Sequence, residues 1–127
     1  MLVDDLLSIA PGVRYVAVYR GGALQSRERA GLTNASASES DRYEELIVNP
    51  ALLTLVRQRG EIDCGGARWV LIRYGSFFQM VFPVDGGHVS VAFEPGEDPV
   101  AREPAVRRVL AAHGLVAPDD RPAPAGR

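Results

Sequence analysis

Residues 67–93 read ARWVLIRYGSFFQMVFPVDGGHVSVAF, and this stretch decides the fold. It contains three apolar runs that are separated by the turn residues Gly75-Ser76 and Asp85-Gly86-Gly87. Glycine and aspartate favour the tight turns that join antiparallel strands. We therefore predict a three-stranded meander with strands over Ala67–Tyr74, Phe77–Pro83 and His88–Phe93.

Residues 13–29 have the pattern of a second hairpin. Val13–Arg20 is apolar on both of its alternating faces, which predicts a strand that is covered on both sides. Gly21-Gly22 provides the positive φ angles that a tight hairpin turn requires. The return strand, about Ala23–Arg29, is polar and charged, as expected of an edge strand that must not pair with other chains.

Two amphipathic segments predict a helix at each end of the domain. Apolar residues from Leu2 to Ile9 follow helical spacing, and Pro11-Gly12 ends that segment. The last helix begins either at Asp98-Pro99 or at Pro104, and Gly114 ends it.

A longer helical segment lies between the hairpin and the meander, from about Glu39 to Arg59, with Gly60 as the expected C-cap. Its apolar residues share one face in the first half and a nearly opposite face in the second half: Tyr43, Leu46 and Ile47 against Leu52, Leu53, Leu55 and Val56. Asn49-Pro50 lies between them and has the pattern of an N-cap followed by proline at the first helical position. Two interpretations stay open: the helix breaks and restarts at Asn49, or one kinked helix buries two faces against two partners, which implies a subunit interface.

Length and charge narrow the range of functions. The 127 residues fit one domain, which we place at residues 1–115, followed by a disordered tail at residues 116–127. The net charge of −2 gives no basic field that would attract nucleic acid. No apolar run approaches the roughly 18 residues of a membrane span, and the N-terminus lacks the pattern of a signal peptide. We therefore expect neither nucleic acid nor a membrane as a partner.

The absence of lysine and the presence of a single cysteine exclude several kinds of site. All 14 basic residues are arginine, so the lysine of a P-loop and the lysine of a Schiff-base enzyme are both absent. Cys64 is the only cysteine, which excludes an internal disulfide and fits a cytoplasmic protein. His88 and His113 are the only histidines, and neither has carboxylates at the spacing of a metal site.

The remaining reactive residues do not form a catalytic set. Glu44-Glu45 and Asp4-Asp5 lie near helix starts, where adjacent acids complement the helix dipole as surface charge. Cys64 and His88 could serve as nucleophile and base, but a small loop or core cysteine is the simpler interpretation. We therefore expect a non-enzymatic protein with no catalytic residue, no metal and no cofactor.

The order of elements, α-β-β-α-β-β-β-α, resembles that of the roadblock / dynein light chain family. The segments that carry the resemblance are LLSIAPGVRYVAVYRGGALQSR at residues 6–27 and GARWVLIRYGSFFQMVFP at residues 66–83. The resemblance covers nearly the whole chain and implies an α+β fold with a five-stranded antiparallel sheet in the order 2-1-5-4-3. It also implies that the first and last helices cover one face and the middle helix the other, a layout shared with profilin-like folds.

The same resemblance implies a homodimeric adaptor without a nucleotide site of its own. Members of the family pair their third strands into one continuous sheet, with the middle helices side by side. Bacterial members regulate or scaffold small Ras-like GTPases, so a GTPase or a related switch protein is the expected partner. The residues expected at the dimer interface are Tyr43, Leu46, Ile47, Leu53, Trp69, Leu71 and Arg73.

A small-molecule sensor of profilin- or PAS-like layout is the alternative function. Its pocket would lie between the sheet and four large side chains, Tyr15, Tyr19, Phe78 and Met80. Few buried polar groups could face such a pocket, and the candidates are Gln79, Ser90 and His88. Convergent polar groups on an apolar cavity would favour this function, whereas a tightly packed core without a cavity would exclude it.

Overall fold

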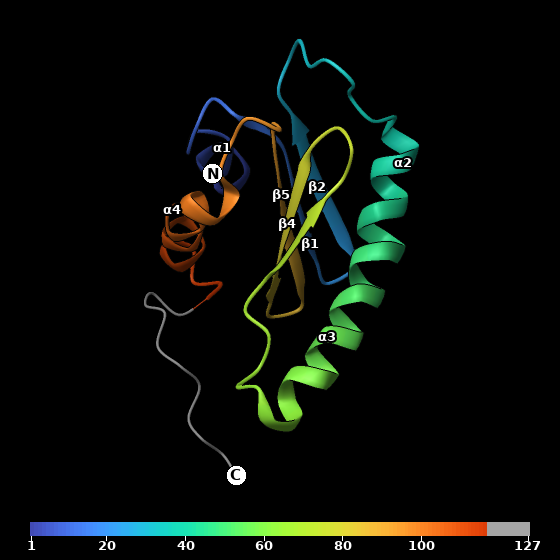
Figure 1. Ribbon diagram of the computed structural model, residues 1–127, viewed down its shortest axis with the longest axis vertical. Coiled ribbons are helices and arrows are strands. Elements are labelled where there is room, and N and C mark those ends of the chain that lie inside the picture. Colours follow the sequence, from blue (N-terminus) through green and yellow to red (C-terminus); the bar gives the residue numbers. More distant parts are fainter. Residues whose placement is uncertain (117–127) are drawn as a thin grey trace.

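The structure is a computed structural model that describes residues 1–116, and it has the expected order of elements (Figure 1). In chain order these are α1 (Leu2–Leu7), β1 (Val13–Arg20), β2 (Ala23–Glu28), α2 (Ser38–Tyr43), the π-helical turn η1 (Glu44–Val48), α3 (Asn49–Asp63), β3 (Val70–Arg73), β4 (Phe78–Val84), β5 (Gly87–Phe93) and α4 (Pro99–Ala112).

The strands form one open antiparallel sheet in the order β2-β1-β5-β4-β3, with β2 and β3 at its edges. The predicted α+β class, strand number and strand order are therefore confirmed. In Figure 1, α1 and α4 lie on one side of the sheet, and the long helix formed by α2, η1 and α3 lies on the other. The predicted distribution of helices over the two faces is also confirmed.

The main hydrophobic core lies between the sheet and the pair α1 and α4. Side chains alternate between the two faces of a strand, so every second residue of β1, β4 and β5 points into this core. The core includes Val3, Leu6, Val16, Val18, Met80, Phe82, Val89, Val91, Phe93, Val106 and Leu110, all buried. Each large side chain buried here contributes about 1.5–3 kcal/mol to the folded state.

The opposite face of the sheet is polar, although the long helix covers it. The alternation that sends Val16 and Val18 into the core turns Tyr15 and Tyr19 toward this helix. Gln79 on β4 and both His88 and Ser90 on β5 face the same way, and these three side chains are buried. Buried polar groups need hydrogen-bond partners, so this face must contain a hydrogen-bonded layer.

The long helix is continuous, so the interpretation that it breaks and restarts at Asn49 is wrong. Asn49 has helical angles (φ −65°, ψ −43°), and its side chain caps no backbone N–H. The π turn η1 comes directly before it. Pro50 has no N–H to donate to the preceding turn, so regular helical hydrogen bonding is interrupted here. A π turn widens the helix at such an interruption.

The predicted C-cap at Gly60 is also wrong, because α3 continues to Asp63. Gly60 is buried, and its carbonyl oxygen accepts a hydrogen bond from the amide of Gly66 (3.0 Å). A Cβ atom at position 60 would lie 3.0 Å from the carbonyl carbon of Gly66. Glycine is therefore required here because the following loop packs back onto the helix, and not because the helix ends.

The beginning of α4 decides between the two predicted starts. Asp98 is the N-cap, and its Oδ1 accepts a hydrogen bond from the amide of Ala101 (3.3 Å). Pro99 occupies the first helical position, where its missing N–H has no consequence. Pro104 lies inside the helix, so a restart at Pro104 is wrong.

Two further differences concern the limits of elements. β3 spans only Val70–Arg73 of the predicted strand Ala67–Tyr74. The disorder predicted for residues 116–127 falls outside the described residues except at Val116, which packs against the core. Within the described residues, no helix is both long and apolar enough to cross a membrane.

Candidate functional site

A fully buried carboxylate lies between the long helix and the sheet. The side chain of Glu45 has an exposed fraction of 0%. Its Oε1 lies 2.8 Å from Nε2 of His88 and accepts hydrogen bonds from Oγ of Ser90 (2.7 Å) and Nδ2 of Asn49 (3.0 Å). The assignment of Glu44-Glu45 to surface charge is therefore wrong for Glu45.

The second carboxylate oxygen completes this buried polar cluster. Oε2 of Glu45 accepts longer hydrogen bonds from the hydroxyl of Tyr15 (3.3 Å) and from Nε2 of Gln79 (3.4 Å). Donors on β1, β4 and β5 thus meet one acceptor from the helix. We call Tyr15, Glu45, Asn49, Gln79, His88 and Ser90 the Glu45 cluster.

Local geometry explains why these side chains meet. Residues four apart lie on the same face of a helix, so Glu45, Asn49 and Leu53 point together toward the sheet; all three are buried. On the sheet, Ser90 lies between Ala17 and Val81 in the register of the strands. These are small or β-branched neighbours, so they leave room for the carboxylate.

The cluster can hold a buried charge because donors surround it. An ionised carboxylate is only an acceptor, and its two oxygens can take about four hydrogen bonds. A buried carboxylate is tolerated when its oxygens are hydrogen-bonded, and side chains of five residues lie within hydrogen-bond distance of Glu45. Within the Glu45 cluster, Oδ1 of Asn49 has no hydrogen-bond partner among residues 1–116.

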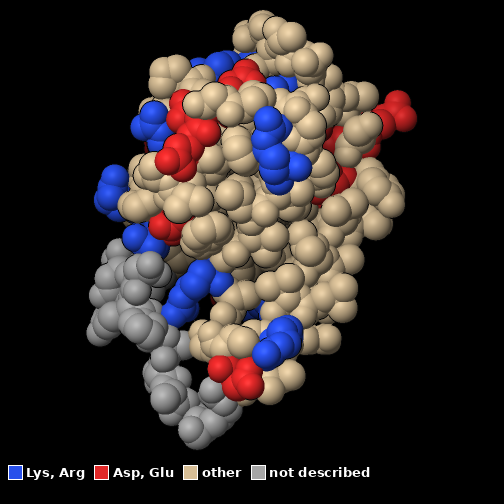
Figure 2. All heavy atoms as spheres, in the orientation of Figure 1, with Lys and Arg blue, Asp and Glu red and all other residues tan. Residues whose placement is uncertain are grey.

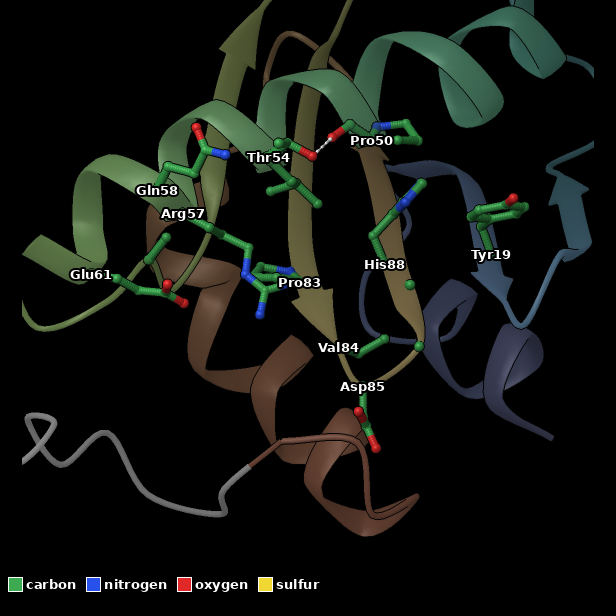
Figure 3. A pocket seen from close by; sticks show the side chains of 14 residues that line it. Tyr19, Pro50, Thr54, Arg57, Gln58, Glu61, Pro83, Val84, Asp85 and His88 are labelled. Atoms are coloured by element: carbon green, nitrogen blue, oxygen red, sulfur yellow. Dashed lines mark hydrogen bonds between the residues drawn. The ribbon is translucent and has the colours of Figure 1, made fainter.

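A cleft opens beside the cluster, between α3 and the β4–β5 turn, with a volume of about 810 Å³ (Figure 3). His88 lines it, with an exposed side-chain fraction of only 2%. The ring of Tyr19 is tilted against that of His88, with 5.6 Å between the ring centroids. The rest of the lining combines apolar and polar side chains, among them Pro50, Leu53, Thr54, Arg57, Glu61 and Pro83.

A smaller hollow of about 80 Å³ lies on the other side of Glu45, near the start of the long helix. Burial raises the pKa of Asp41, and the negative charges of Glu28 and Glu45 raise it further, against the opposing effect of Arg14. Burial raises the pKa of Glu44 as well, although the hydrogen bond from Tyr74 lowers it. This end of the helix therefore disfavours additional negative charge.

The two tyrosines that contact these acids remain protonated. Burial and the hydrogen bond to Glu44 raise the pKa of Tyr74 to about 12. Burial raises the pKa of Tyr15, and the nearby charge of Glu45 raises it further. Both phenols are therefore hydrogen-bond donors to carboxylates across the physiological pH range.

The predicted interface residues occupy three different environments. Tyr43 and Ile47 are exposed, and Leu46 is half-buried. Trp69 and Leu71 are half-buried and pack against the core beside α1 and α4. Arg73 is exposed and lies over the ring of Phe78, 4.9 Å from its centroid, whereas Leu53 is buried beneath the helix.

The predicted sensor pocket is only partly present. Tyr15 and Tyr19 lie on the helix-covered face, but Phe78 and Met80 belong to the core on the opposite face, so the four residues do not line one cavity. The three predicted buried polar residues are all in the Glu45 cluster. Sequence reasoning missed Glu45 and Asn49; their i, i+4 spacing opposite the apolar Tyr43 and Ile47 was the available signal.

The other candidates for chemistry remain separate. Cys64 is exposed at the C-cap of α3, where its Sγ donates to Oδ1 of Asp63 (3.4 Å), whereas His88, its hypothetical base, is buried and contacts Glu45. His113 contacts Asp5, with Nε2 2.9 Å from Oδ2, and thereby ties α4 to α1. Within residues 1–116, no group of three or more histidine, cysteine or acidic residues could hold a metal ion.

Removing the buried carboxylate tests its structural role. We expect Glu45→Ala to lower the free energy of unfolding by about 3–5 kcal/mol, because it leaves buried donors unpaired. Glu44→Ala is the matched control; it removes only the half-buried partner of Tyr74 and should cost about 0.5–1.5 kcal/mol. Urea unfolding measures both, and equal losses in the two variants would contradict the role of Glu45.

The raised pKa of Asp41 predicts a pH-dependent effect. Because its folded-state pKa lies above the unfolded value, the ionised group opposes folding near pH 7, and this effect disappears below the unfolded value of about 4. Asp41→Asn should therefore raise the melting temperature near pH 7 and have little effect near pH 3. Glu39→Gln, an exposed acid in the same turn, is the control; an identical pH profile for both variants would refute the interpretation.

Comparison with protein-family models gives no match, and comparison with curated protein sequences gives no significant match.

Proposed function

We propose that the protein is a homodimeric adaptor whose two copies join through β3. The observation that supports this proposal is an apolar edge strand: β3 reads Val-Leu-Ile-Arg and, among the strands of residues 1–116, pairs with β4 alone. An apolar edge with unpaired backbone groups favours addition of another strand. By contrast, β2 at the other edge is largely exposed and polar, the composition that opposes such pairing.

The register indicates which backbone groups are free. The amide of Tyr74 donates to the carbonyl of Phe77 (2.9 Å), so these residues form a hydrogen-bonded pair. Hydrogen-bonded and non-hydrogen-bonded pairs alternate along an antiparallel ladder. It follows that Ile72 bonds to β4, whereas the backbone groups of Leu71 and Arg73 point away from the sheet. A second copy can accept and donate at these positions.

A second β3 strand is the occupant that fits this edge. A two-fold axis would pair Leu71 and Arg73 with the same residues of the other copy and satisfy both edges at once. The result would be a continuous sheet of two domains with a long helix of each copy on the same face. A small domain with one exposed apolar edge gains most from such symmetric pairing, because no unpaired apolar edge remains.

The outer face of the long helix supports a role in binding a further protein. Its exposed apolar residues are Tyr43 (62%), Ile47 (55%), Leu55 (67%) and Ile62 (62%). Figure 2 shows a further area without charged side chains between α4 and α3 of Figure 1, which lies over the open edge of the sheet and not over the outer face of the long helix. Depletion of charge and enrichment of aromatic residues are typical of interface centres. We propose a small Ras-like GTPase or a related switch protein as the partner, in line with the family resemblance, and a cytoplasmic location.

The β3 interface is tested with a substitution that removes the backbone N–H of Arg73, which points away from β4. We expect Arg73→Pro to weaken the dimer about tenfold or more, because each copy loses a hydrogen bond across the axis. The ladder to β4 should persist, since the Arg73 amide points away from it. Arg73→Ala removes the side chain but keeps the N–H, so it serves as the control.

Light scattering during gel filtration, over a dilution series, measures this effect. A wild-type dimer that persists in Arg73→Ala and dissociates in Arg73→Pro supports the interface. A wild-type monomer at every concentration, or equal affinity in the two variants, contradicts it.

Partner binding is tested with a small Ras-like GTPase from the same genome. We expect the wild-type protein to bind it and to change its rate of GTP hydrolysis, and the double variant Tyr43→Glu/Ile47→Glu to lose binding by at least tenfold. Val100→Glu places the same charge at an exposed apolar residue of α4 and should bind normally. Absence of binding by the wild-type dimer would remove the GTPase from the proposal and leave dimerisation untouched.

A further inference from the structure

The smaller hollow at the start of the long helix, with a volume of about 80 Å³, is lined mainly by acidic charge. Its acids are Glu28, Asp41, Glu44 and Glu45. Arg14 is the basic residue of the lining, and its guanidinium is already committed to a carboxylate oxygen of Glu94 (2.8 Å) and to three backbone carbonyls. We call this cavity the Asp41 hollow; its negative charge exceeds the positive charge that is available to balance it.

Asp41 is the acid of the hollow that most needs a partner. Its side chain is half-buried, and its carboxylate accepts no hydrogen bond and forms no ion pair within residues 1–116. Burial raises the pKa of Asp41, and the negative charges of Glu28 and Glu45 raise it further. A carboxylate in such surroundings is stabilised by a cation that comes close to it. The hollow is therefore built to favour a positive group.

Gln79 is a second and neutral group that indicates a ligand. Its side chain is only 2% exposed and lines the hollow, and its Nε2 donates to Oε2 of Glu45 (3.4 Å). This hydrogen bond fixes the amide, because the reverse orientation would place two acceptor oxygens against each other. Oε1 of Gln79 then has no hydrogen-bond partner within the described residues and is not sealed from solvent. A buried amide oxygen without a partner is costly, so the hollow also requires a hydrogen-bond donor.

The size of the hollow and its lining indicate which cation fits. About 80 Å³ holds several water molecules but lies far below the roughly 300–1,000 Å³ of a site for a whole small molecule. No group of three or more histidine, cysteine or acidic residues in residues 1–116 could hold a metal ion. The hollow therefore suits the charged end of a longer side chain.

A guanidinium fits the lining better than an ammonium group does. It carries several N–H donors in one plane and stacks on aromatic rings. The acceptors of the hollow lie on different elements, with the carboxylate of Asp41 on α2 and the amide oxygen of Gln79 on β4. Tyr15 and Phe77 add aromatic walls, and Arg14 already lies over the Phe77 ring, 5.2 Å from its centroid.

The hollow borders the exposed apolar residues at the start of the long helix. Residues three apart are neighbours on a helix surface. Tyr43 follows Ser40 by three residues, and Ile47 follows Glu44 by three; Ser40 and Glu44 both line the hollow. A protein that covers Tyr43 and Ile47 can therefore reach the hollow with a side chain.

We propose that the Asp41 hollow receives the guanidinium of an arginine side chain from the protein that docks on Tyr43 and Ile47. The guanidinium pairs with the carboxylate of Asp41 and donates to Oε1 of Gln79. This inference rests on the proposed adaptor function and specifies the partner's surface, which carries an exposed arginine surrounded by apolar side chains.

The experiment uses N-acetyl-arginine amide as the probe and N-acetyl-citrulline amide as its neutral counterpart of the same shape. Titration of the full-length protein is followed by ¹H–¹⁵N chemical shifts. We expect saturable binding of the arginine probe that shifts the side-chain amide of Gln79 and leaves that of Gln58, which lines the larger cleft, unchanged. The citrulline probe should bind about tenfold more weakly or worse, because it lacks the charge that Asp41 recognises.

Two acid variants locate the site and separate binding from folding. Asp41→Asn should weaken binding of the arginine probe by about tenfold or more and yet raise the melting temperature near pH 7, because it removes an unbalanced charge. Glu39→Gln removes an exposed acid of the same turn that does not line the hollow, so it should bind as the wild type does.

Four results would overturn the proposal: no saturation by the arginine probe, equal binding of the citrulline probe, equal weakening in the two variants, or tighter binding of free arginine than of the capped probe. The last result would identify the free amino acid as the ligand. The titration contains no GTPase, so its failure leaves the GTPase proposal standing. Conversely, a protein that binds the arginine probe but no GTPase retains the hollow and loses only that partner.

Discussion

A carboxylate buried between a helix and a sheet must receive hydrogen bonds from both, and this requirement at Glu45 organises the molecule. The donors are fixed on three adjacent strands, so they define one position for the carboxylate above the sheet. A helix that carries Glu45 brings the carboxylate to these donors in only one rotational orientation of the helix about its axis. The π turn Glu44–Val48 contains Glu45, so it lies at the point of the helix where this orientation is fixed.

The exposed apolar face of the long helix follows from this rotation. With Glu45 and Asn49 directed at the sheet, Tyr43 and Ile47 must point to solvent. A regular amphipathic helix would place its apolar residues inward, and the reversal leaves a surface suited to a protein partner. The same rotation places Glu45 against His88, so the exposed apolar surface and the contact between helix and sheet depend on one buried group.

The sequence predicted the fold better than the site, for physical reasons. The meander and the first hairpin are determined by local signals, namely alternating apolar residues and glycine turns at Gly21-Gly22 and Asp85-Gly86-Gly87. Strand order is not local, and the family resemblance supplied it. The predicted burial of Gln79, Ser90 and His88 is confirmed because each interrupts an apolar strand at a position that faces the helix.

Glu45 and Gly60 show where local reasoning fails. A glutamate near a helix start complements the helix dipole, and only the tertiary position of four partners on the strands reveals that Glu45 is buried. Glycine after an amphipathic segment usually ends a helix, whereas Gly60 accommodates a loop that returns to the helix at Gly66. Both errors concern contacts between different segments, Glu45 with the strands and Gly60 with the loop at Gly66, which the periodicity of one segment does not encode.

The central claim is that Glu45 and His88 act as one buried unit that joins helix to sheet. A double-mutant cycle with Glu45→Gln, His88→Gln and the combined variant tests it most directly, with the free energy of unfolding measured in urea. We predict that the combined loss is smaller than the sum of the single losses by about 1–3 kcal/mol, as expected for groups in direct contact. Losses that add to within about 0.5 kcal/mol would show that the two side chains are independent, and would contradict the claim.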